Sequence, residues 1–200
     1  MNRIADLGDR ILEVQRDLGL KNPDFFSPGI NPDKLGSMKE FSMSGFDSEL
    51  FSLFAWKNGA TLDPSVPMKD LWLVPGFYLL PFSKAIEINK YLSKNIEDYS
   101  RFYYPLTSSG SSNHHFVDLS RKGAASGKVP VFYYDPEGDM IVNQIYDDIE
   151  AMFSAILECY MQNAFYVGLE GYLKKNAQRE AMISREYNPK SEYWRRDDLF

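Results

Sequence analysis

The chain has few of the cysteine and histidine residues on which disulfide-rich and metal-binding proteins depend. Its 200 residues include one cysteine, Cys159, and two histidines, His114 and His115. A single cysteine excludes an internal disulfide and a zinc site built from several thiolates. Proteins of oxidising compartments more often carry paired cysteines, so we expect a cytoplasmic protein. A chain of this length buries enough surface to fold without a metal, and we expect no cofactor.

Long apolar runs are also missing. Stretches such as "CYMQNAFYVGL" are far shorter than the roughly 18 apolar residues that a membrane span needs. The N-terminal "MNRIADLGDRILEVQRDLGL" is charged every few residues, which does not fit a signal peptide. We therefore expect no contact with a membrane.

Positive charge is absent from one long part of the chain. Residues 129–173 hold eight acidic residues and no Lys or Arg, whereas the net charge of the whole chain is −6. A nucleic-acid interface needs clustered Lys and Arg, so none is expected here. An acidic surface would instead attract a basic partner. The alternative is an ordinary solvated face without a partner.

Helical periodicity appears in separate parts of the chain. Ile149, Met152, Phe153, Ile156 and Tyr160 form an apolar stripe that predicts a helix, with Asp147 or Asp148 as its N-cap. Residues 21–38 are rich in Pro, Gly and Asn and predict a long loop. Further helices are predicted over residues 3–18, 47–59, 83–95 and 176–187. Trp56, in the helix predicted over 47–59, is either a buried residue or an interface anchor.

Strand patterns cluster in the middle of the chain. Short segments rich in aromatic and β-branched residues are separated by turn residues over 101–106, 114–120, 128–135 and 140–146. Neighbours this close cannot be parallel, so we predict an antiparallel meander and an α+β fold. We expect one domain over residues 1–170 and a helical extension and tail over 171–200, the tail either docked or free.

The stretch "SSGSSNHHFVDLS" holds the main candidates for catalysis. A hydrolase would use Ser109 as nucleophile or His114 as base or metal ligand. Adjacent histidines on a strand point to opposite faces, however, and Asp118 lies roughly 10–13 Å away along an extended chain. We therefore predict a loop between two antiparallel strands, with no catalytic and no metal site.

Several of these motifs, taken in order, resemble the SMI1/KNR4 family of the SUKH superfamily. They are a helix ending at Trp56, Asn58 and Gly59, a strand entering "LLPF", the segment "FVDLS", and "GKVPVFYYDPEGD" before the helix near Ile149. The resemblance covers residues 47–166. It implies a twisted antiparallel sheet flanked by N-terminal and C-terminal helices, and no enzymatic activity. Many bacterial members are immunity proteins that neutralise a toxin, often a nuclease; eukaryotic relatives act in cell-wall regulation and signalling.

The resemblance and the acidic span together predict a protein-binding function. We expect an immunity protein that neutralises a cognate bacterial toxin with a basic surface, such as a nuclease, by direct binding. The alternatives are a regulatory or scaffold module for an endogenous protein and, in another class, the Ser109/His114 hydrolase. The residues predicted to contact the partner are Tyr133, Tyr134, Asp135, Glu137, Asp139, Asp147, Asp148 and Glu150.

Overall fold

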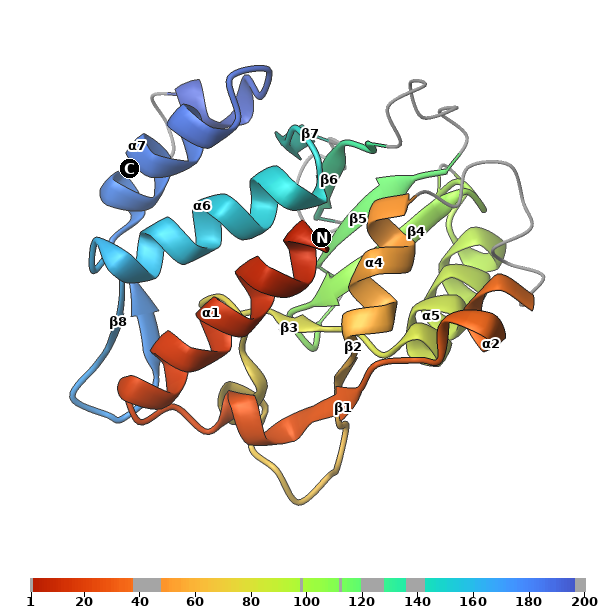
Figure 1. The fold of residues 1–200 in the computed structure, drawn as a ribbon. Helices are drawn as coiled ribbons and strands as arrows, with labels where there is room; N and C mark the ends of the chain where they lie inside the picture. Colours follow the sequence, from red (N-terminus) through yellow and green to blue (C-terminus); the bar gives the residue numbers. More distant parts are fainter. Residues whose placement is uncertain are drawn as a thin grey trace.

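The computed structural model describes residues 2–37, 48–97, 99–111, 113–119, 128–135 and 143–196, which form an α+β structure (Figure 1). The α-helices are α1 (Arg3–Asp17), α2 (Pro32–Ser37), α4 (Ser48–Trp56), α5 (Phe82–Asn95), α6 (Ile149–Met161) and α7 (Ala177–Tyr187). Short 3-10 helices are η1 (Asn22–Phe25), η2 (Met68–Leu71) and η3 (Tyr193–Arg195). None of the helices within these ranges is long and apolar enough to cross a membrane.

The largest sheet has five strands in the order β3-β4-β5-β6-β7, and each neighbouring pair is antiparallel. Its strands are β3 (Tyr78–Leu79), β4 (Tyr103–Ser108), β5 (His114–Asp118), β6 (Val131–Tyr134) and β7 (Asn143–Tyr146). Two smaller antiparallel sheets pair β1 (Phe26–Pro28) with β2 (Lys57–Ala60), and β8 (Phe165–Val167) with β9 (Leu173–Lys175). The predicted α+β class and antiparallel meander are confirmed.

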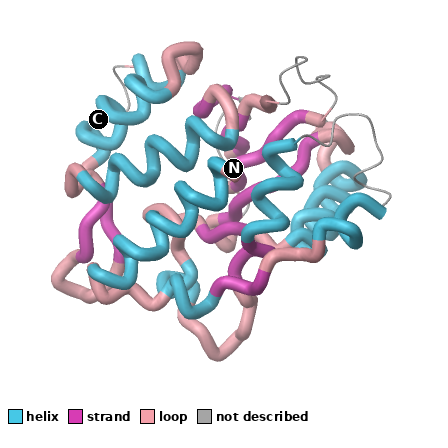
Figure 2. Tube along the Cα trace, in the orientation of Figure 1, coloured by secondary structure: helices cyan, strands magenta, loops and turns pink. Residues whose placement is uncertain are grey.

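Both faces of the five-stranded sheet are buried under helices. Side chains alternate along a strand, so Phe116 and Val117 of β5 point to opposite faces. Val117 joins the main core, whereas Phe116 packs in a smaller cluster with Leu92 of α5. Helices α1, α4 and α6 lie over the first face, and α5 lies over the second (Figure 1 and Figure 2).

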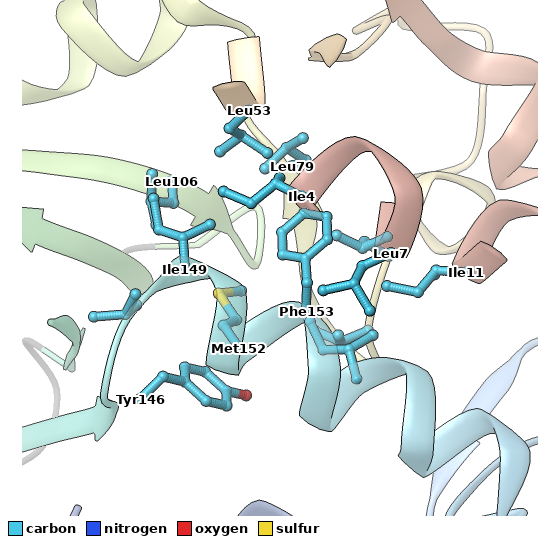
Figure 3. Close-up of a cluster of buried hydrophobic side chains, with 14 of the residues drawn as sticks. Ile4, Leu7, Ile11, Leu53, Leu79, Leu106, Tyr146, Ile149, Met152 and Phe153 are labelled. Carbon is cyan, nitrogen blue, oxygen red and sulfur yellow. The ribbon is translucent and has the colours of Figure 1, made fainter. Parts of the chain in front are cut away.

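The main core forms where α1, α4 and α6 meet the sheet (Figure 3). Every member of the predicted stripe on α6 is buried, and Phe153 packs edge-on against Trp56 with ring centroids 5.8 Å apart. Of the two predicted N-caps, Asp148 caps the helix: its carboxylate accepts a 2.7 Å hydrogen bond from the backbone N–H of Ala151. Figure 3 labels the central side chains, Ile4, Leu7, Ile11, Leu53, Leu79, Leu106, Tyr146, Ile149, Met152 and Phe153.

Trp56 is a buried residue of this core. Its ring lies so close to Gly8 that a Cβ there would come within 2.4 Å of it. Its indole N–H donates a 2.8 Å hydrogen bond to Asp9. The burial alternative is therefore the one that the structure supports. The helix ends at Trp56, and the predicted stop residues Asn58 and Gly59 belong to β2.

The loop predicted over residues 21–38 is wrong, because this segment contains η1, β1 and α2. Phe26 of β1 pairs with Ala60 of β2, and Leu35 of α2 is completely buried. Its Pro, Gly and Asn residues are local turn signals. They carry no information about a strand partner more than thirty residues away in the sequence.

The C-terminal segment docks on the sheet as far as the structure describes it. Trp194 is buried, and its indole N–H donates a 2.5 Å hydrogen bond to the carbonyl of Ile145 in β7. The hydroxyl of Ser191 donates to the carbonyl of Gln144 on the same strand at 2.9 Å. The tail residues 188–196 are thus part of the folded structure, and α7 packs along α6 (Figure 1).

Two glycines with positive φ provide a matched test of the packing around β2. Gly59 has φ +71°, and a Cβ there would lie 2.3 Å from the backbone of Leu80; Gly76 has φ +87° with open space around it. We expect Gly76→Ala to lower the free energy of unfolding by about 1–2 kcal/mol through backbone strain, and Gly59→Ala to lower it by clearly more. Urea unfolding measures both. Equal losses would contradict the close approach of β2 to Leu80.

Candidate functional site

The two histidines lie on opposite faces of the sheet. The ring of His114 is on the α5 side, stacked near Tyr134 with centroids 6.4 Å apart. The ring of His115 is on the other side and stacks on Phe77 at 4.5 Å. Its Nδ1 lies 2.9 Å from the hydroxyl of Thr107 on the neighbouring strand. The pair therefore cannot act together on one metal ion or one substrate.

Burial keeps both imidazoles neutral near pH 7. Desolvation lowers the pKa of His114 to about 4. Desolvation, with smaller contributions from Lys175 and His114, lowers the pKa of His115 to about 3. A general base is most effective when its pKa lies near the working pH. Both rings are far from that condition and serve as packing groups of the sheet.

The serines of the β4–β5 loop bond within the loop. The hydroxyl of Ser109 lies 2.6 Å from that of Ser111 and also donates to the carbonyl of Asn113 at 3.4 Å. Asp118 lies at the far end of β5, opposite Tyr103. The structure thus does not bring Ser109, His114 and Asp118 together in the hydrogen-bonded chain that a catalytic triad requires.

Other candidates for reactive or metal-binding chemistry are buried or separate. Cys159 lies inside α6, and burial raises the pKa of its thiol, which disfavours the reactive thiolate. Within the described parts of the chain, no group of three or more His, Cys, Asp or Glu residues could hold a metal ion.

Four carboxylates gather where α6 begins, and we call them the acidic cluster: Glu49, Asp147, Asp148 and Glu150. Glu49 belongs to the first turn of α4, and the other three precede or begin α6. The first turns of α4 and α6 and the N-terminal end of α1 meet at this end of the molecule (Figure 1). Segments far apart in the sequence thus build one charged surface.

Glu49 is the buried member of the acidic cluster. It is 7% exposed, and its two carboxylate oxygens accept hydrogen bonds from the backbone N–H groups of Ile149 at 3.2 Å and Glu150 at 3.3 Å. A carboxylate at this position is stabilised by the positive end of the α6 dipole. Desolvation and the neighbouring Asp148 outweigh these effects and raise its pKa to about 7.

Two cations lie over the outer members of the cluster. The ammonium of Lys128 is 3.1 Å from Asp148 and 3.3 Å from Glu150. The guanidinium of Arg3 is 3.7 Å from Glu150. Among the described residues, Lys128 and Arg3 pair with Asp148 and Glu150, and Asp147 forms no ion pair. Ion pairs as exposed as that of Arg3 are worth about 0–1 kcal/mol, so a partner's cations can replace them at little cost.

Asp147 connects the acidic cluster to the C-terminal segment. Its carboxylate accepts a 3.3 Å hydrogen bond from the backbone N–H of Lys190, and its own N–H donates to the side chain of Asn188 at 2.9 Å. The segment before the tail is thereby fixed next to the start of α6. Asp147 has a structural role in addition to its charge.

The remaining residues of the predicted contact set do not form one patch. Tyr133 and Asp135 lie toward the other end of β6, and the hydroxyl of Tyr133 accepts a 2.9 Å hydrogen bond from Asn113. Tyr134 points to the α5 face and is only 3% exposed, so it cannot meet a partner at the surface. Glu137 and Asp139 lie outside the described residues. The structure therefore brings together Asp147, Asp148 and Glu150 and separates them from Tyr133 and Asp135.

Sequence reasoning missed several residues that shape this region. Glu49 and Arg3 come from the N-terminal third of the chain, and no local pattern links them to a helix that begins at least one hundred residues later. Lys128 is one residue before the base-free span, so its ion pairs neutralise part of the charge that the composition alone assigns to that span.

A small polar cavity that the sequence did not predict lies between the sheet and the C-terminal segment. It has a volume of about 100 Å³. Lys175 and Glu180 form a 2.7 Å ion pair in its wall, and burial, partly offset by Lys175, raises the pKa of Glu180. The wall also includes His115, Tyr133, Tyr146, Tyr193 and Trp194.

Comparisons with known proteins add no assignment to this geometry. No protein-family model matches the chain, and no curated protein matches it.

The buried histidines lead to an NMR prediction. The chain has two imidazoles, and we expect neither to titrate near the ordinary pKa of 6.5 in the folded protein. Unfolded imidazoles do take up protons there, so the contribution of the two histidines to the free energy of unfolding should fall as the pH decreases from 6.5 toward 4. Ring-proton shifts against pH test this. A midpoint near 6.5 for either ring would show that it is accessible to solvent.

Glu49 has the opposite effect on stability. Its folded pKa of about 7 lies above the ordinary 4.5, so the folded state binds the proton more tightly. The contribution of Glu49 to stability is complete below pH 4.5 and is lost as the pH rises through 7. Relative to Glu49→Gln, the natural chain should gain roughly 1–3 kcal/mol of unfolding free energy between pH 7 and pH 4.5. Urea unfolding of the natural chain and of Glu49→Gln at several pH values measures the difference.

Proposed function

We propose that this protein is a non-enzymatic binding protein that neutralises a bacterial toxin in the cytoplasm by direct association, as the SMI1/KNR4 resemblance implies. The observation that carries the proposal is the acidic cluster, in which Asp147, Asp148 and Glu150 lie together at the start of α6, beside Lys128 and Arg3 and next to the buried Glu49. Such a surface is complementary to a basic protein, and a nuclease toxin must be basic to hold phosphate groups.

The cluster is held rigidly before any partner arrives. Glu49 is fixed by two backbone N–H groups, Asp148 by the N-cap hydrogen bond, and Asp147 by the C-terminal segment. A surface that is ordered in the free protein loses little conformational entropy on binding. Inhibition by occlusion needs this kind of prearranged surface and no chemical step.

The burial of the two histidines and the hydrogen bonds of Ser109 within its loop support binding in preference to hydrolysis. His114 and His115 are packed inside the sheet as neutral rings, and Ser109 bonds to its own loop. The regulatory or scaffold alternative uses the same surface and differs only in the partner. It is distinguished by whether that partner is toxic when produced alone.

The proposal is tested in two steps. A tagged chain is produced in its native host, and proteins that co-purify with it are identified. The strongest partner is then produced alone and together with the chain. We expect the partner to stop growth when produced alone and growth to resume in the presence of the chain.

Charge variants then test the surface with the purified pair. We expect Glu150→Gln to slow association several-fold at low ionic strength, because a steering charge is removed from the acidic cluster. Glu87→Gln removes the same charge from α5 and should leave the rate unchanged. Stopped-flow association rates at low and high salt measure both. Equal rates for the two variants would assign binding to another surface, and a harmless partner would favour the regulatory module.

A further inference from the structure

A second, larger cavity lies on the side of the molecule away from the acidic cluster. Its volume is about 270 Å³, near the lower end of the range for small-molecule sites. It is formed by the turn between α1 and η1, the segment around η2 and the turn between β8 and β9, at the lower left of Figure 1. The side chains used below are Lys21, Asn22, Lys69, Asp70, Trp72 and Tyr172.

Two aromatic rings form walls of this cavity. Trp72 and Tyr172 lie nearly perpendicular to each other, with centroids 6.1 Å apart. Aromatic walls favour a flat ligand, because a planar group keeps contact with a ring over its whole area.

Two of the lining residues each have a buried polar atom without a hydrogen-bond partner. These atoms are the indole Nε1 of Trp72 and the side-chain oxygen of Asn22. Buried polar atoms are nearly always paired, so each such exception requires an explanation. One is a donor and the other an acceptor, so a single ligand with both kinds of group would satisfy them.

The network behind Asn22 fixes which of its atoms is unpaired. The side-chain nitrogen of Gln15 donates to the hydroxyl of Tyr160 at 2.7 Å and to the carbonyl of Leu73 at 3.2 Å. Gln15 must therefore present its oxygen to Asn22, which donates to it through Nδ2 at 2.8 Å. The remaining oxygen of Asn22 is the acceptor without a partner.

The charges at the rim favour an anionic ligand. Lys21 pairs with Asp70 at 3.6 Å, and Lys174 pairs with Glu170 at 2.7 Å. Lys69 has no ion pair with a carboxylate of the described residues, and its ammonium lies 5.2 Å from the centroid of the Tyr172 ring. One cation is thus available beside an aromatic wall.

We propose that this cavity binds a small planar carboxylate that also carries a hydrogen-bond donor. The carboxylate faces Lys69 and accepts from the indole of Trp72, the ring lies against the aromatic walls, and the donor group faces the oxygen of Asn22. Both polar atoms are covered by neighbouring groups, so the ligand must displace part of this cover to reach them. This site is separate from the acidic cluster and does not depend on the proposed partner.

The probe is 2-aminobenzoate, added to the purified full chain without any partner protein. The chain has three tryptophans, and in nitrogen-15 spectra their indole N–H signals can be followed individually. Trp56 and Trp194 donate to Asp9 and to the carbonyl of Ile145, whereas Trp72 has no acceptor. Trp72→Phe identifies the signal of Trp72 by its loss. We expect this signal to move with increasing probe and the other two to stay.

Variants and related probes distinguish specific binding from nonspecific contact. Lys69→Gln should weaken the affinity for 2-aminobenzoate several-fold, whereas Lys84→Gln removes the same charge from α5 and should not. Benzoate lacks the donor and should bind several-fold more weakly; aniline lacks the anion and should not move the signal of Trp72. The proposal is overturned if 2-aminobenzoate does not move the Trp72 signal of the natural chain. It is also overturned if aniline moves that signal as much as 2-aminobenzoate does, or if Lys69→Gln binds 2-aminobenzoate as tightly as the natural chain does.

Discussion

The burial of both faces of one antiparallel sheet is the constraint on which the rest of this structure depends. Because side chains alternate along β5, consecutive residues enter different hydrophobic environments. His114 enters the cluster under α5, and His115 enters the core side next to Phe77. The same alternation carries Tyr133 and Tyr134 to opposite faces. The adjacent histidines, which in the sequence look like a catalytic or metal-binding pair, therefore lie in two separate hydrophobic clusters and contribute to the packing of the sheet.

Local patterns predicted the parts of the fold that short-range physics determines. The apolar stripe of α6 predicts a helix from residues within the helix itself, and the short connections between β4 and β7 predict antiparallel pairing of neighbouring strands. Strand β1 and the β8–β9 hairpin were missed because they lack a strong alternating pattern. Of the candidate site, Asp147, Asp148 and Glu150 were predicted together. Glu49 was not, because only tertiary packing brings α4 to the start of α6.

The acidic cluster shows why charge composition alone describes a surface incompletely. The base-free span is acidic in sequence, yet Lys128 and Arg3 approach it from outside its limits. Burial further reduces the charge, since the pKa of Glu49 is raised to about 7. The surface therefore carries a smaller charge than the sequence implies, and this charge lies on ordered elements. Such a surface gains selectivity from its geometry as well as from its charge.

The hydrogen bonds of Ser191 and Trp194 to the carbonyls of Gln144 and Ile145 have a consequence for solubility. Strand β7 is an edge strand of the five-stranded sheet. An uncovered edge strand is a template for pairing with a strand of another molecule. By bonding to carbonyls of β7 and placing the indole of Trp194 against it, the C-terminal segment covers part of this edge. We expect a chain that ended before these residues to leave that part of the edge open to another strand.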